Sequence, residues 1–206
     1  MAKLTSGILG KASGKVAGVV AGSWKGVNYV REYVVPANPN TVLQQAQRTL
    51  MQTIVLYCKQ LLTALIQPYW DPLSTVVSGW NLIVKKNLKS MSDSTDFENF
   101  KISDGSLEGD AISSCTYSTG DGEVMMSFSG EIKSNGLATD KCIACIIDIE
   151  HDFLYLSVDE ETRSAAGLGM TIATGLTVAN LKSYLAFHRA DGTLMSQTAY
   201  KQVTAA

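Results

Sequence analysis

Lys141-Cys-Ile-Ala-Cys-Ile-Ile-Asp-Ile149 is an unbroken, mostly apolar run, and it predicts a β-strand in the C-terminal half of the chain. Comparable short runs follow one another from about Phe100 onward, separated by turns that contain Gly and Asp or Asn. We expect strands at 111–118, 124–129, 142–149, 153–158, 170–174, 183–189 and 194–203, with turns at 120–122, 134–136 and 190–192. About seven strands at this spacing are typical of an antiparallel sandwich. Residues 93–206 are therefore predicted to form an Ig-like β-sandwich domain.

Two of the four cysteines, Cys142 and Cys145, lie three residues apart in the opening run, and the others are Cys58 and Cys115. Side chains alternate between the two faces of a strand, so an odd separation places these two sulfur atoms on opposite faces. A zinc site would require a turn at this point and further ligands that the sequence does not offer. We therefore expect buried free thiols and no metal site.

A second pattern, over residues 36–92, predicts an antiparallel helical hairpin. Asn40 or Thr41 is expected to cap the first helix, and Pro68 is expected to end it. Its apolar face is Leu43, Ala46, Leu50, Ile54, Cys58, Leu61 and Leu65. Asp71 and Pro72 are expected to cap and open the second helix. The apolar face of that helix is Leu73, Val77, Trp80, Val84 and Leu88.

The first 35 residues are rich in glycine and predict a β-hairpin or extended arm, which we call the arm (residues 1–35). Two runs rich in β-branched residues, 16–21 and 27–35, flank a predicted turn-rich link over 22–26. A lone hairpin is barely stable in water, so the arm must lie against its own chain or against a partner. The fold class is therefore predicted as α+β, with an arm, a helical hairpin (36–92) and a sandwich (93–206).

Charge divides along the 206-residue chain. Residues 1–92 carry ten Lys/Arg and two acidic residues (+8), and residues 93–206 carry seven and seventeen (−10), which together give the net charge of −2. Two differently charged solvated surfaces would explain this, and so would a basic arm that finds an acidic body on the next subunit. The basic residues are scattered without an aromatic-interleaved stripe, which argues against nucleic-acid binding.

The sequence offers no complete catalytic motif. Gly10-Lys-Ala-Ser-Gly14-Lys15 has three residues between its glycines, whereas a phosphate-binding loop has four. His151 and His188 lack a companion nucleophile motif, and Asp148, Glu150 and Asp152 lack the spacing of a calcium loop. We expect a protein that is not an enzyme, with no catalytic residue, cofactor, metal or small-molecule substrate.

No stretch of 18 uncharged apolar residues is present, so no membrane span is predicted. The N-terminus lacks the apolar core of a secretory signal. We expect synthesis in the cytoplasm and a final location in a virion or an extracellular assembly.

A family likeness rests on the pattern Gly14-Lys-Val-Ala-Gly18…Gly22-Ser-Trp24-Lys25-Gly26-Val-Asn28-Tyr-Val30-Arg31…Pro36…Asn38-Pro39…Thr41…Gln44…Gln47-Arg48. This pattern resembles a family of phage and prophage virion-associated structural proteins. With the ending Tyr184-Leu-Ala-Phe…Asp191-Gly192…Ser196-Gln197…Tyr200, it also resembles an uncharacterised family of similar length from Bacteroidota. The likeness covers the first third and the last tenth of the chain. It implies a phage structural role and carries over no catalytic residues.

The function expected from these observations is a structural subunit that assembles with copies of itself or with other virion proteins, as a head-decoration, head–tail or tail component. The alternative is an extracellular or cell-surface filament subunit whose arm adds a strand to the next subunit. The candidate assembly contacts are Trp24, Lys25, Asn28, Tyr29, Arg31 and Tyr33. Docking of the arm on its own chain and docking on a partner both remain open at this point.

Overall fold

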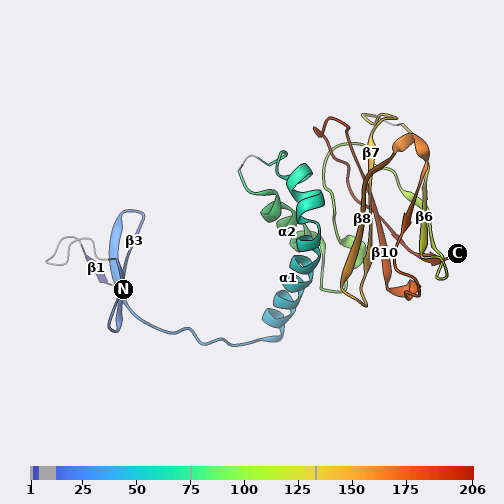
Figure 1. Cartoon of the computed structure of the whole chain (residues 1–206). Helices are drawn as coiled ribbons and strands as arrows, with labels where there is room; N and C mark the ends of the chain where they lie inside the picture. The colour runs from blue at the N-terminus through green and yellow to red at the C-terminus, as the bar shows by residue number, and fades with distance from the viewer. Residues whose placement is uncertain (1, 5–12, 75, 133) are drawn as a thin grey trace. The chain divides into compact units, whose positions relative to one another are not determined.

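The computed structural model describes residues 2–4, 13–74, 76–132 and 134–206. It divides into two compact units, residues 1–41 and residues 42–206 (Figure 1). The described residues combine helices with largely antiparallel sheets, which confirms the predicted α+β class.

Within its described residues, the larger unit contains two four-stranded sheets. One has the order β12-β5-β6-β9, built from β5 (Ile112–Tyr117), β6 (Glu123–Phe128), β9 (Gly167–Thr171) and β12 (Thr204–Ala205). The other has the order β11-β10-β7-β8, built from β7 (Lys141–Asp148), β8 (Phe153–Thr162), β10 (Leu181–His188) and β11 (Ala199–Gln202). All pairs are antiparallel except β12 with β5. This is the strand distribution of an Ig-like sandwich in which β8, the fourth strand in chain order, lies in the sheet of β7 and β10 and not in the sheet of β5 and β6.

Three predicted strands differ from the observed ones by more than two residues at an end. The fourth predicted strand, 153–158, is β8, which continues to Thr162. The fifth predicted strand, 170–174, is β9 and ends at Thr171 after beginning at Gly167. The last, 194–203, does not begin until Ala199, because residues 195–197 form isolated bridges to the connection before β5 and to His188 instead of a continuous ladder.

Strands β7 and β10 are buried on both faces, which explains their unbroken apolar sequence. One face contributes Cys142, Ala144 and Ile146 to the core between the two sheets. The other face contributes Ile143 and Cys145 to a second core beneath the helices. The two thiols therefore point to opposite faces, as the odd spacing predicts.

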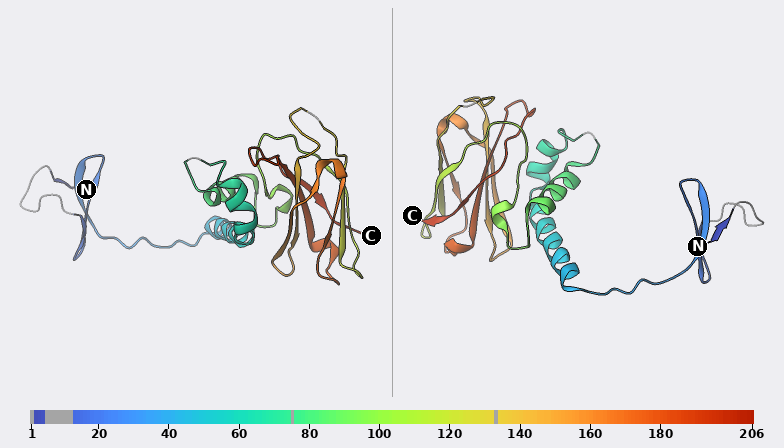
Figure 2. Two further views of the ribbon diagram at one scale, coloured as in Figure 1. Left: turned by 45° about the horizontal axis from the view of Figure 1, so that its top comes forward. Right: turned by 180° about the vertical axis from the view of Figure 1, so that it is seen from behind.

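The helices lie on one side of the sandwich, against the sheet that contains β7 and β10 (Figures 1 and 2). They are α1 (Val42–Gln60), the π-helix η1 (Leu62–Trp70) and α2 (Gly79–Ser90). Short 3-10 helices follow at η2 (Phe97–Asn99), η3 (Arg163–Ala165) and η4 (Val178–Asn180). Of the described helices, no single one is long and apolar enough to cross a membrane. The pair α1 and η1 would pass that test together, but the two helices meet at 87°.

The predicted helix boundaries at the two prolines are wrong. Pro68 does not end the first helical segment, because it lies inside η1, where wider π-type turns accommodate a missing backbone donor. Asp71 and Pro72 do not open the second helix, which begins at Gly79 after a loop. Asp71 nevertheless acts at that helix, because its Oδ1 accepts a hydrogen bond from the Gly79 N–H at 2.6 Å.

The smaller unit contains a four-stranded antiparallel sheet among its described residues, in the order β1-β4-β3-β2. Its strands are β1 (Ala2–Leu4), β2 (Gly14–Val16), β3 (Val19–Trp24) and β4 (Val27–Glu32). The turn between β3 and β4 is only Lys25-Gly26, shorter than the predicted link over 22–26. Both residues have positive φ, 48° and 79°, as the two-residue hairpin turn that suits strand twist requires.

Candidate functional site

Three of the candidate assembly contacts share one face of the arm sheet. Trp24 lies opposite Val27, and Tyr29 lies opposite Gly22 on the neighbouring strand. Arg31 follows Tyr29 by two residues, so strand alternation places it on the same face. Asn28 points to the other face, and Lys25 lies in the turn.

Lys15 and Tyr33 extend this face at the end away from the turn. The Lys15 Nζ lies 3.4 Å from the centre of the Tyr33 ring, a cation–π contact. The Tyr33 N–H donates to the Gly18 carbonyl at 2.8 Å, which holds the residue beside the sheet after β4 has ended. We call Lys15, Trp24, Tyr29, Arg31 and Tyr33 the basic aromatic face.

Gly22 makes room for the Tyr29 ring on this face. A Cβ atom at position 22 would lie 3.0 Å from the Tyr29 hydroxyl oxygen. The ring therefore lies across the glycine, and Tyr29 is half-buried, whereas the Trp24 side chain is 72% exposed. Tryptophan is one of the three residue types enriched among the side chains that dominate the binding energy of protein interfaces.

The smaller unit lacks an apolar core among its described side chains. Of residues 13–15 and 17–41, none is buried. A sheet of this size normally gains its stability from a covered apolar face.

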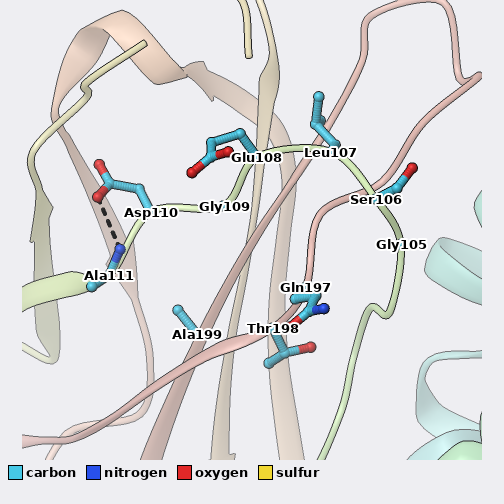
Figure 3. Close-up of a pocket in the computed structure, with 10 residues that line it drawn as sticks. All are labelled: Gly105, Ser106, Leu107, Glu108, Gly109, Asp110, Ala111, Gln197, Thr198 and Ala199. Atoms are coloured by element: carbon cyan, nitrogen blue, oxygen red, sulfur yellow. Dashed lines mark hydrogen bonds between the residues drawn. The ribbon is translucent and has the colours of Figure 1, made fainter. Parts of the chain in front are cut away.

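The sandwich contains a shallow pocket of about 450 Å³ between the connection 105–111 and the segment 197–199 (Figure 3). Two carboxylates, Glu108 and Asp110, line it. The Asp110 carboxylate is already used: Oδ1 accepts from the Ala111 N–H, and Oδ2 accepts from the Ser129 hydroxyl and the Gly130 N–H. Figure 3 shows the other side chains spread around a bend, without convergence on a common point. This arrangement fixes a turn and offers no acid–base pair.

Both histidines form pairs with carboxylates. The His151 Nδ1 lies 2.6 Å from the buried Asp148 carboxylate, and this hydrogen bond and the negative charge raise the pKa of His151. His188, which is buried at the end of β10, faces the Asp159 carboxylate and packs on the Tyr69 ring. Tyr69 in turn donates to Asp159 at 3.0 Å. Neither imidazole hydrogen-bonds a serine, threonine or cysteine in the described part of the chain. The contacts among Tyr69, Asp159 and His188 connect η1 to β8 and β10.

All four cysteines are free and buried. Burial raises the pKa of Cys58 and of Cys142 to about 12 and that of Cys145 further, so these thiols stay protonated and unreactive at neutral pH. Within the described ranges, no group of three or more His, Cys, Asp or Glu side chains is arranged to hold a metal ion.

One surface was not predicted from sequence: the outer edge of β8, which among the described strands pairs with β7 alone. The sequence indicated the strand itself. Its place at the edge of a sheet depends on the order of strands in space, which the linear pattern does not contain.

A family model described as a family of unknown function (DUF6266) matches residues 11–202 of the chain. No curated protein and no solved structure matches it.

Proposed function

We propose that this chain, which belongs to the DUF6266 family, is a non-enzymatic structural subunit that assembles with copies of itself through its arm. The observation that carries the proposal is the absence of any buried side chain among residues 13–15 and 17–35, in a sheet that presents Trp24 to solvent. A partner surface would supply the missing cover.

The larger unit needs no covering surface from a partner, which supports different roles for the two parts. Its described residues contain two apolar cores, one between the sheets and one beneath the helices. A stable body joined to an arm without a core is the arrangement expected of a subunit that completes its fold on assembly.

The assembly we propose is a virion component, a head-decoration, head–tail or tail protein. Support comes from the resemblance of the Trp24-Lys25-Gly26 to Arg48 pattern to phage structural proteins. A filament subunit that assembles by strand addition is the second candidate, and the unpaired outer edge of β8 favours it.

Sedimentation of the full chain and of a variant lacking residues 1–35 tests the proposal. We expect the full chain to self-associate and the truncated chain to be a folded monomer, because its cores are intact. Trp24→Ala should weaken self-association at least tenfold, the loss that removing an interface anchor causes (about 1.4 kcal/mol or more). Val76→Ala, at a residue that is 92% exposed on the body, is the matched control and should leave it unchanged. Oligomers that persist without the arm would refute the proposal.

A further inference from the structure

We infer that the outer edge of β8 receives the segment Tyr33–Val35 from a second copy of the chain, which adds as a short strand. The inference rests on the proposed function and names the recipient surface. Strand addition to an open sheet edge is a common mode of peptide recognition, in which main-chain hydrogen bonds supply the affinity.

The hydrogen bonds around β8 show which of its backbone groups face outward. The Leu154 N–H donates to the Gln60 Oε1 at 2.9 Å, so this group points away from β7. Backbone groups alternate sides along a strand, and the N–H and C=O of Leu156 therefore also face outward. In the described chain no partner is found for either group of Leu156.

The open part of this edge is short. At one end the Gln60 side-chain amide occupies it, accepting from Leu154 and donating to the Asp152 carbonyl at 2.9 Å, as a strand neighbour would. At the other end β8 bulges around Asp159, where φ is +66° and the ladder to β7 loses its register. The open stretch between the Gln60 side chain and the bulge at Asp159 is centred on Leu156 and fits a strand of about three residues.

A groove of about 550 Å³ lies along this gap, between β8 and β9. Phe153 and Tyr155 line it from β8, and Met170 lines it from β9. The ring centroids of Phe153 and Tyr155 are 4.9 Å apart in an edge-to-face arrangement. Phe153 is 50% exposed. The groove therefore combines unpaired main-chain groups with apolar side chains, as a site for a β-strand requires.

The arm ends in a segment that matches this site. Val34 and Val35 are 63% and 72% exposed, and in the described chain neither makes a hydrogen bond. β-branched residues favour the extended conformation. Pro36 follows and has no N–H to continue a ladder, which limits the added strand to the residues before it.

Charge favours the same pairing. Residues 142–162, which include all of β8, contain six acidic residues and no Lys or Arg. Residues 1–41 contain five Lys/Arg and one acidic residue. All of these acidic residues except the buried Asp148 are exposed. The basic aromatic face would thus approach exposed carboxylates when Tyr33–Val35 enters the groove.

Chain length favours a second copy over the same chain. The 19 residues of α1 separate Val42 from Gln60 by about 27 Å at 1.5 Å per residue. The seven steps from Val35 to Val42 reach at most about 25 Å when fully extended. Even a fully extended linker would therefore fall short of the same chain's Gln60, whereas a second copy has no such constraint.

Disulfide trapping between two single-cysteine variants tests the inference. Val34→Cys and Phe153→Cys proteins are mixed, oxidised mildly and resolved without reductant; the four native thiols are buried and serve as the common background. We expect a mixed dimer to form at least ten times faster than in a control mixture of Val34→Cys with Ser106→Cys, whose exposed cysteine lies at the pocket of Figure 3. A Val34→Cys/Phe153→Cys double variant reports crosslinking within one chain.

The outcomes separate the two proposals. Self-association in sedimentation without the mixed disulfide would overturn the recipient site and leave the proposed function standing. A crosslink formed only within the double variant would overturn the second copy as donor. A monomeric full chain would overturn the proposed function and the inference with it. Leu156→Pro gives an independent check, since it removes one outward N–H: loss of assembly with unchanged far-UV circular dichroism supports the site, and undiminished assembly contradicts it.

Discussion

Arg163 is the largest fully buried side chain in the described part of the molecule, and its charge is only loosely compensated. Its Nη2 lies 3.5 Å from the buried Asp140 carboxylate, its guanidinium lies 4.2 Å from the Phe187 ring centre, and its Nε and Nη1 lack a partner. A buried ion pair of this kind contributes little net stability, but loss of one member leaves an uncompensated charge in the core.

Arg163→Met should therefore lower the free energy of unfolding by about 3 kcal/mol, because Asp140 would remain buried without its main counter-ion. The double variant Arg163→Met/Asp140→Leu should recover most of that loss. Urea denaturation of the two variants and the wild type measures the difference. A double variant less stable than Arg163→Met would show instead that Asp140 stabilises the fold through its other contacts, the Leu137 N–H at 2.7 Å and Arg189 at 3.8 Å.

His151 gives the body a pH dependence whose sign follows from its raised pKa. The protonated ring pairs with Asp148, so the stabilisation is fully present below the ordinary histidine pKa of about 6.5 and is lost as pH rises through the raised folded-state value. The urea midpoint of wild type should exceed that of His151→Gln at pH 5.5, and the gap should close by pH 8.5. A gap that is constant with pH would exclude this ion pair as its source.

At the scale of elements, the start of α2 depends on a contact between residues that are eight positions apart. A Cβ at Gly79 would lie 2.7 Å from both the backbone N and the Oδ1 of Asp71. Ala normally stabilises a helix by about 1 kcal/mol relative to Gly. A decrease in the free energy of unfolding on Gly79→Ala would therefore show that the contact with Asp71 outweighs helix propensity. We expect a loss of about 2 kcal/mol in thermal or urea unfolding. Gly120→Ala, where a Cβ meets nothing within 4 Å, is the control and should be nearly neutral.

The same contact shows what the sequence could and could not predict. Alternation and helical periodicity depend on neighbouring residues, and they correctly indicated β7, the opposite faces of Cys142 and Cys145, and the existence of two helical segments. The end of the first segment and the start of the second depend on tertiary contacts, such as that of Asp71 with Gly79, and were predicted wrongly. In the arm, strand alternation explains the shared face of Trp24, Tyr29 and Arg31, but the two-residue turn that sets their register became visible only in the structure.

For the whole molecule, the two units carry net charges of opposite sign, and this bears on assembly. Residues 1–41 carry five basic residues and one acidic residue (+4), and residues 42–206 carry twelve and eighteen (−6). Opposite charges on arm and body would steer subunits head to tail, since the arm of one copy is attracted to the body of the next.

Self-association should therefore weaken as sodium chloride rises from 50 to 500 mM, because the Debye length falls from about 14 Å to about 4 Å over that range. Burial of Trp24 and Val34 would not weaken in the same way, since apolar association does not depend on counter-ion screening. Sedimentation at several salt concentrations separates the two contributions. Lys25→Glu, in the exposed turn beside Trp24, should reduce assembly at 50 mM salt by more than at 500 mM. Assembly that is equally strong at both concentrations would exclude a contribution from charge attraction. The apolar and main-chain contacts of β8 would then be its basis.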